Sequence, residues 1–209
     1  MSGGNRARIA VLVSGGGTNL QALIDAEQSG ILHSGTIALV LSSNPAAYAL
    51  TRAEKAGIPA AVVTKTDCGS QAGFERTLNE HLRRYAIDMI VLAGFMTILS
   101  GDFTDLWQNK IINVHPSLIP AFCGKGMYGL RVHAAALSYG VKVTGATVHY
   151  VNAVPDGGRI LLQKAVEIQE GDTPETLQKR VMEQAEWVIL PQAAEMVSAR
   201  IVKEKQEKA

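Results

Sequence analysis

The sequence predicts an α/β protein with an open, mostly parallel, doubly wound sheet that is Rossmann-like in its N-terminal half. Two observations carry this prediction. Several short runs are apolar throughout, and between them lie segments in which apolar residues recur at helical spacing. Strands of this kind are covered by helices on both faces, and strand–helix–strand units form right-handed parallel crossovers. A third observation is that two β-rich segments follow each other closely after Gly140. We therefore expect the late strands to be mixed or antiparallel.

The first two-thirds of the chain supplies five expected strands and the helices between them. The apolar runs of strand length are residues 9–13, 36–41, 60–63, 89–93 and 111–114. Helical spacing begins at Leu20, and an Ala-rich helical stretch after Asn44-Pro45 ends at Lys55. A further helix is expected over residues 69–85.

The last third is expected to form two more strands and a long C-terminal helix. The strands cover residues 142–151 and 159–168, and Pro174 suits the first position of a helix that runs to about Arg200. Pro191 should kink or break this helix because proline lacks the N–H that an α-helix requires. We expect residues 1–209 to form one domain, with a phosphate-binding half at about 8–100, a catalytic half at about 101–201 and a frayed tail at 202–209.

Composition narrows the class of function. The chain has 209 residues, of which 47% are hydrophobic and 19% charged, and its formal net charge is +1. A binder of long nucleic acid normally shows a basic excess, so that class is disfavoured. Two cysteines are too few for a disulfide-stapled secreted fold, and residues 1–8 lack the apolar segment of a signal peptide. We expect a cytoplasmic protein with neither nucleic acid nor membrane as a partner.

The first candidate site is the loop Ser14-Gly15-Gly16-Gly17-Thr18-Asn19, which separates the first strand from a helix. Unpaired amides at a helix N-terminus bind phosphate, and glycines allow the backbone to approach the anion. The third glycine of the dinucleotide fingerprint is replaced by Leu20, which favours a single phosphate. The alternative is a tight turn capped by Thr18 or Asn19.

The second candidate site is the pair Asn113 and His115, at the end of the fifth strand. Side chains two residues apart on a strand share a face, and open parallel sheets place ligands at the carboxyl ends of their strands. An amide beside an imidazole suits acyl transfer, because one stabilises a developing oxyanion and the other moves protons. A histidine satisfied at a strand end is the alternative.

Other polar residues give weaker signals. Asp156 precedes two glycines and is a turn former, or it orients an imidazole if its loop folds over the sheet edge. His149 is expected to be a half-buried, hydrogen-bonded strand residue without a catalytic role. The chain has no Cys-x-x-Cys, His-x-x-x-His or His-Glu-x-x-His spacing, so no metal site is predicted.

These pieces together closely resemble the phosphoribosylglycinamide formyltransferases, the folate-dependent enzymes of purine synthesis. The resemblance covers about residues 8–200, and its motifs stand in family order: VSGGGTNLQA at 13–22, LAGFM at 92–96, INVHPSLIP at 112–120, TVHYV at 147–151 and DGG at 156–158. The resemblance implies the formyltransferase fold. It also implies transfer of the formyl group of 10-formyltetrahydrofolate to the amine of 5-phosphoribosylglycinamide, without a metal.

The resemblance also assigns residues to roles. Asn113 would hold the formyl oxygen as it becomes an oxyanion, His115 would be the general acid and base, and Asp156 would position and charge it. The 5′-phosphate would bind to Gly17, Thr18 and Asn19, and the ribose to Glu186. The folate pocket would be lined by Asn113 and by Met96, Thr97, Ile98, Leu99, Gln71 and the loop 152–156.

The sequence departs from the family pattern on the folate side. Thr97 and Gln71 stand where many relatives carry Arg, so the folate's glutamate tail would be held less electrostatically, or by Lys65 or Lys125. The stretch 122–131 is longer than the usual loop, and no contact is transferred into it.

Other folate enzymes of this fold are the main alternatives. Methionyl-tRNA formyltransferase shares the Asn-x-His-Pro-Ser-Leu motif but needs a further C-terminal RNA-binding domain. Formyltetrahydrofolate deformylase resembles this chain only behind an extra N-terminal domain, and sugar-nucleotide formyltransferases usually carry additional sequence. A catalytically silent phosphoribosyl-binding protein would lose the Asn, His and Asp set, which is present here. A monomer and a homodimer are both compatible with the sequence.

Overall fold

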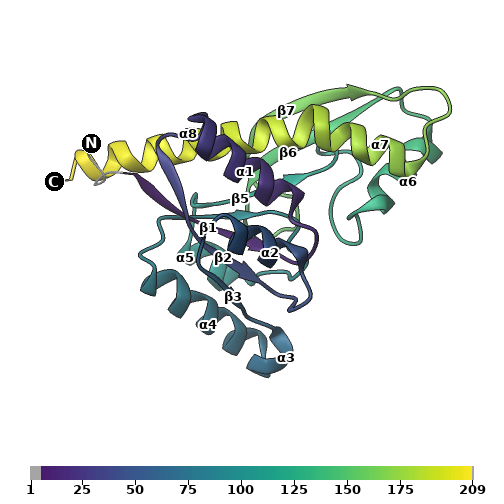
Figure 1. Cartoon of the computed structure of the whole chain (residues 1–209). Coiled ribbons are helices and arrows are strands. Elements are labelled where there is room, and N and C mark those ends of the chain that lie inside the picture. The colour runs from purple at the N-terminus through teal and green to yellow at the C-terminus, as the bar shows by residue number, and fades with distance from the viewer. Residues whose placement is uncertain (1–5, 209) are drawn as a thin grey trace.

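The computed structural model describes residues 6–208 and contains one seven-stranded sheet (Figure 1). The expectation for residues 1–8 rests largely on residues 1–5, which lie outside the described part. The strands are β1 (Ala7–Val13), β2 (Gly35–Ser42), β3 (Ala60–Val62), β4 (Met89–Leu92), β5 (Ile111–His115), β6 (Val143–Tyr150) and β7 (Ile160–Glu167). They are arranged in the order β3-β2-β1-β4-β5-β6-β7.

The pairing directions confirm the predicted fold class. Strands β3, β2, β1, β4 and β5 pair in parallel, whereas β6 pairs antiparallel with β5, and β7 pairs antiparallel with β6. The chain proceeds from β1 outward to β3 and then returns to β4 on the other side of β1. In open α/β sheets, ligands bind beyond the carboxyl ends of the strands at such a reversal. The topology therefore directs attention to the loops that follow β1 and β4.

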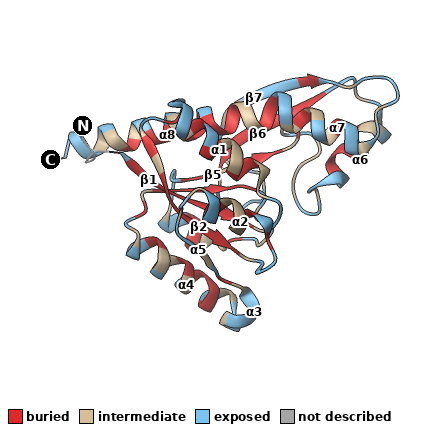
Figure 2. Ribbon diagram, viewed as in Figure 1, coloured by how far each residue is buried: buried red, intermediate tan, exposed pale blue. Residues whose placement is uncertain are grey.

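Helices cover both faces of the sheet, which explains why the central strands are apolar throughout (Figure 2). The helices are α1 (Thr18–Ser29), α2 (Tyr48–Lys55), α3 (Lys65–Cys68), α4 (Gln71–Arg84), α5 (Gly101–Leu106), α6 (Leu130–Tyr139), α7 (Pro174–Val181) and α8 (Trp187–Gln206). One core cluster joins the sheet to α1, α2, α7 and α8, and a second joins it to α4 and α5. Helices α5 and α6 fall in stretches for which the sequence predicted no element.

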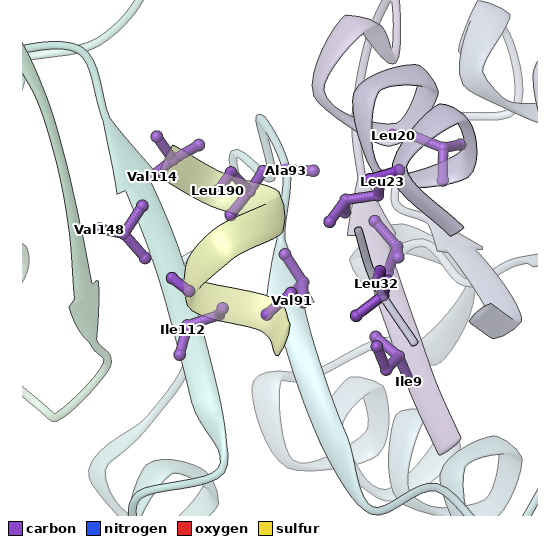
Figure 3. Packing of buried hydrophobic residues seen from close by; sticks show 14 of the residues in the cluster. Ile9, Leu20, Leu23, Leu32, Val91, Ala93, Ile112, Val114, Val148 and Leu190 are labelled. Atoms are coloured by element: carbon purple, nitrogen blue, oxygen red, sulfur yellow. The ribbon is translucent and has the colours of Figure 1, made fainter. Parts of the chain in front are cut away.

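Helix α8 crosses one face of the sheet and fills the centre of the first cluster (Figure 3). Leu190 from α8 lies over the sheet among Val91 of β4, Ile112 of β5 and Val148 of β6. All four side chains are fully buried. This packing fixes the start of α8 over the same strands that carry the candidate catalytic residues.

Of the two outcomes predicted for Pro191, a kink or a break, the break does not occur. Helix α8 continues through Pro191, which is buried inside it. The chain departs from α-helical geometry earlier, in the π-helical segment η1 (Met182–Glu186), which joins α7 to α8. A helix tolerates an internal proline at the cost of one hydrogen bond when packing holds the segment in place, and here α8 is packed against the sheet.

The predicted frayed tail at 202–209 is also corrected, since α8 remains helical to Gln206. Ion pairs four residues apart join Arg200 to Glu204 and Lys203 to Glu207, and Lys205 Nζ lies 2.7 Å from an oxygen of Asp88. Pairs at this spacing stabilise a helix surface. Ala209 lies outside the described residues.

Candidate active site

The glycine-rich loop after β1 is shaped by its contacts with α2. The carbonyl of Gly15 accepts the N–H of Ala49 at 3.1 Å, and the carbonyl of Gly16 accepts Arg52 Nε at 2.9 Å. Gly17 has a φ of +73°, and a Cβ added there would lie 2.6 Å from the Cβ of Ala49. With the carbonyls bound on this side, no N–H of Gly15, Gly16 or Gly17 donates to an acceptor among residues 6–208. The loop therefore presents donors at the start of α1.

Asn19 and Glu186 form a buried pair beside this loop. Asn19 Nδ2 donates to Glu186 Oε2 at 2.7 Å, while Asn19 Oδ1 has no hydrogen-bond partner among the described residues. Burial raises the pKa of Glu186 above its ordinary value, and the hydrogen bond from Asn19 opposes part of that rise. The π-helical segment η1 ends at Glu186 and so delivers its carboxyl to the first turn of α1. The pair thus links the N-terminal and C-terminal parts of the chain at the site.

Asn113 lies opposite His149 because β5 and β6 pair antiparallel in a register that matches these two residues. Asn113 Nδ2 and His149 Nε2 are 3.3 Å apart, and His149 Nδ1 is 2.8 Å from the carbonyl of Tyr150. Both ring nitrogens of His149 therefore have partners, and its side chain is buried. The sequence correctly predicted a hydrogen-bonded strand histidine, but His149 is fully buried rather than half-buried, and the sequence did not indicate that it lies against the amide of Asn113.

Asp156 brings two histidines together. Its Oδ2 lies 3.5 Å from His115 Nδ1, and its Oδ1 lies 3.5 Å from His149 Nε2. Burial acts to raise the pKa of Asp156, but the hydrogen bonds to His149 and to the N–H of Gly124, together with the attraction of His115 and His149, outweigh it and lower the pKa below its ordinary value. Asp156 is therefore a carboxylate at neutral pH.

The loop of Asp156 is constrained to make these contacts. Asp156 has a φ of +55°, a left-handed conformation that costs energy for a residue with a side chain and is common at functional sites. A Cβ at Gly158 would lie 1.7 Å from the carbonyl oxygen of Tyr150, so only glycine fits against β6 there. The turn predicted for this sequence and the proposed contact with an imidazole both occur.

His115 lies between Asp156 and the loop that follows β5. Its Nε2 is 2.8 Å from the carbonyl oxygen of Phe122, on the opposite side of the ring from Asp156. Phe122 itself has a φ of +50°. Both neighbours of the ring are acceptors, so a doubly protonated imidazolium satisfies both contacts.

Apart from Gly17 and Thr18, the predicted site residues line three hollows. The central cavity, of about 490 Å³, includes among its lining Asn19, Met96, Ile98, Asn113, His115, Asp156 and Glu186. A smaller pocket of about 130 Å³ is lined by Met96–Leu99, Asn113, His149 and residues 151–156. A third hollow of about 460 Å³ is lined by Lys65, Gln71 and Met96–Ser100. Asn113 and Asp156 border the first two, where the catalytic groups meet.

Thr18 does not line the central cavity. Its hydroxyl donates to the sulfur of Met182 at 3.8 Å, and its side chain borders a separate groove between α1 and α8. Gln71 lies at the far end of the segment Met96–Leu99, where its amide donates to the carbonyl of Ile98 at 3.1 Å. Of the described residues, none form a cluster of three His, Cys, Asp or Glu side chains able to hold a metal ion. Within the same residues, no helix combines the length and apolarity that crossing a bilayer requires.

Comparisons with known proteins identify the family to which the chain is similar. A protein-family model described as formyl transferase matches residues 7–194. The trifunctional purine biosynthetic protein adenosine-3 of Bos taurus is 44% identical over 200 residues, which are 95% of this chain and 19% of that protein. This chain thus spans about a fifth of such relatives. The phosphoribosylglycinamide formyltransferase of Haemophilus influenzae is 42% identical over 88% of this chain and 84% of its own length.

Solved structures show the same fold. Glycinamide ribonucleotide transformylase 1 from Symbiobacterium toebii has a TM-score of 0.87 and 41% identity, and the match covers 94% of this chain and 90% of that one. Phosphoribosylglycinamide formyltransferase from Brucella melitensis has a TM-score of 0.85 and 40% identity, over 93% and 96% of the two chains.

His133, on α6, is a buried histidine whose pKa depends in part on the charge of His115. It is fully buried, and neither ring nitrogen has a partner among the described residues. Burial, and secondarily the charge of His115, lower its pKa from 6.5 to about 4. Between these values the unfolded chain binds more protons than the folded one. The contribution of His133 to stability is therefore complete above pH 6.5 and is lost as the pH falls toward 4.

We expect the His133→Leu variant to lose less stability than wild type on acidification across this range. Chemical denaturation at several pH values measures the difference, which is at most about 1.4 kcal/mol for each pH unit. His81→Leu is the control, because the half-buried side chain of His81 forms no ion pair or hydrogen bond among the described residues. Parallel stability curves for wild type and His133→Leu would contradict the buried neutral state.

Proposed function

The chain belongs to the formyl transferase family, and on that basis we propose that it transfers the formyl group of 10-formyltetrahydrofolate to the amine of 5-phosphoribosylglycinamide, a step of purine synthesis. The product is 5-phosphoribosyl-N-formylglycinamide. Relatives and solved structures that carry the name of this activity cover most of the chain. The observation that carries the proposal is the convergence of Asn113, His115 and Asp156 where the central cavity and the smaller pocket meet.

The smaller pocket and the adjoining hollow suit a folate. One wall is the segment Met96–Leu99 and the other is the loop 151–156, so the pocket offers backbone groups between apolar side chains. A bicyclic ring with many donors and acceptors is held well by such a slot. The hollow beside Lys65 and Gln71 continues along the same segment and leaves room for the tail. The amide of Gln71 binds the Ile98 carbonyl and thereby shapes this wall.

The ribonucleotide is assigned to the central cavity and the glycine-rich loop. Gly17, Thr18 and Asn19 would bind the 5′-phosphate. Gly17 and Thr18 would act through backbone amides, because the Thr18 hydroxyl is bound to Met182. Amides at the start of a 12-residue helix provide the positive potential that a phosphate requires. Glu186 would accept from the ribose, and its pairing with Asn19 keeps it in position.

When bound, the folate supplies a formyl carbon that the substrate amine attacks, so negative charge develops on the formyl oxygen. Asn113 lies where its amide can donate to that oxygen, and His149 fixes the orientation of this amide. Preorganised donors of this kind account for a large part of catalysis in acyl transfer. No metal enters the proposed reaction.

His115 would move the proton in this scheme: the amine loses a proton as it bonds to the formyl carbon, and the folate nitrogen gains one as its bond to that carbon breaks and tetrahydrofolate leaves. Asp156 faces one ring nitrogen, and the other faces the Phe122 carbonyl toward the loop that lines the cavity. Asp156 stabilises the imidazolium, and its pKa is lowered by both histidines and by Gly124, so it keeps its charge while His115 gains or loses a proton. His149 and Asp156 act through Asn113 and His115 respectively and are positioning residues.

The proposal extends to the setting of the enzyme. The half at about 8–100 would hold the phosphate and the half at about 101–201 the catalytic residues. We place the activity in the cytoplasm, with small molecules rather than nucleic acid or membrane as partners and a monomer or homodimer as the assembly. The two free cysteines, Cys68 and Cys123, are consistent with a reducing compartment.

An assay of the purified protein with both substrates tests the proposed function. We expect the formyl group to appear on the amine of the ribonucleotide only when both substrates are present, which absorbance and mass spectrometry of the product would detect. Release of formate in the absence of the ribonucleotide would instead favour the deformylase activity and contradict the proposal.

The roles of His115 and Asp156 predict a large loss of turnover without a loss of fold. We expect His115→Gln and Asp156→Asn each to lower the rate of formyl transfer by about 10²–10⁴-fold, the usual contribution of general acid–base catalysis. His33→Gln makes the same change at an exposed histidine outside the site and should retain full activity. Near-wild-type turnover by either active-site variant, with its circular dichroism spectrum intact, would exclude the mechanism.

A further inference from the structure

The central cavity contains an imbalance of charge. Its lining includes two carboxyl groups, those of Asp156 and Glu186, and among the described residues Lys125 is its one permanently charged cation. A phosphate monoester carries about 1.5 to 2 negative charges at neutral pH. Backbone amides at the start of α1 offset part of that charge, whereas Asp156, a carboxylate, repels it. A mobile cation beside the cavity would complete the binding of such a ligand.

Lys125 is free to serve as that cation. It lies on the loop between β5 and α6, whose residues 124–129 line the cavity together with His115 and Asn19. Its side chain is exposed, and no carboxylate of residues 6–208 lies within ion-pair distance of it. The helix α6 that follows packs against α7 at the same end of the molecule (Figure 1).

The loop is fastened to the catalytic residues at its start. The N–H of Gly124 donates to Asp156 Oδ2 at 2.8 Å, and the carbonyl of Phe122 faces His115 Nε2. Lys125 thus follows directly after a residue that is hydrogen-bonded to the catalytic carboxylate. This attachment keeps Lys125 at the central cavity and away from the hollow beside Gln71.

The rest of the loop contains three glycines in left-handed backbone conformations. Gly124, Gly126 and Gly129 have φ values of +89°, +87° and +56°, and no heavy atom lies within 4 Å of a Cβ added at any of them. Glycine is thus required here for backbone conformation and not for space.

We propose that Lys125, on the loop 122–129, binds the 5′-phosphate of the ribonucleotide. The inference rests on the proposed function, since it takes the ribonucleotide as the ligand of the central cavity. A lysine suits this role because its ammonium is a compact charge with three donors on a flexible stem. The folate tail has its own cation in Lys65, which lines the third hollow.

Binding of ribose 5-phosphate tests this role without requiring catalysis. Isothermal titration calorimetry would compare wild type with Lys125→Met, Lys125→Arg and the control Lys142→Met, which removes an exposed lysine outside the cavities described above. We expect Lys125→Met to weaken binding about tenfold or more, as for loss of a hydrogen bond between charged groups. Lys125→Arg should retain most of the affinity, and Lys142→Met all of it.

Steady-state kinetics with both substrates locates the effect. Lys125→Met should raise the KM for the ribonucleotide by a similar factor, with little change in kcat or in the KM for the folate. Equal binding of ribose 5-phosphate by wild type and Lys125→Met, no binding by wild type, or a rise in the KM for the folate alone would overturn the inference.

The two proposals fail separately. If wild type transfers the formyl group but Lys125→Met binds ribose 5-phosphate as well as wild type does, only the role of Lys125 is lost. If binding depends on Lys125 but wild type transfers no formyl group, the proposed function is wrong and the phosphate contact remains.

Discussion

The arrangement of the site depends on one carboxylate held between two imidazoles. Asp156 contacts His115 with one oxygen and His149 with the other, and it also accepts the N–H of Gly124. These contacts lower the pKa of Asp156 despite its burial, so its carboxylate stays negatively charged beside the two histidines. Removing it would leave His115, His149 and the N–H of Gly124 without this shared contact. The left-handed backbone at Asp156 is the cost of this arrangement.

The sheet topology explains how separate segments of the chain meet beside this carboxylate. After β3 the chain returns to the other side of β1, where β4 lies next to β1 in the sheet. The glycine-rich loop and the segment Met96–Leu99 therefore follow the carboxyl ends of two adjacent strands. Ser14 joins them, because its hydroxyl accepts the N–H of Met96 at 2.9 Å. The antiparallel β6 then brings His149 beside Asn113, and η1 brings Glu186 to Asn19. Segments that are far apart in the sequence thus contribute neighbouring residues to the site.

Much of this could be predicted from the sequence because it depends on local patterns. The apolar runs predicted the strands, and Asn113 and His115 share a face through the period of a strand. His149 was undervalued because its role depends on the register between β5 and β6, which pairs residues 36 positions apart. The sequence also predicted that Pro191 would kink or break the last helix, whereas α8, packed against the sheet, continues through it. The attachment of Gly124 to Asp156 depends on two loops meeting and has no local signal.

The central claim is that His115 and Asp156 work as a unit in moving the proton, and a double-mutant cycle on kcat tests it most directly. The rate of formyl transfer would be compared for wild type, His115→Gln, Asp156→Asn and the double variant. If the two residues act as a unit, the double variant should be about as slow as the slower single variant, because either change alone disables the pair. Losses that multiply in the double variant would show that the residues act independently and would contradict the account.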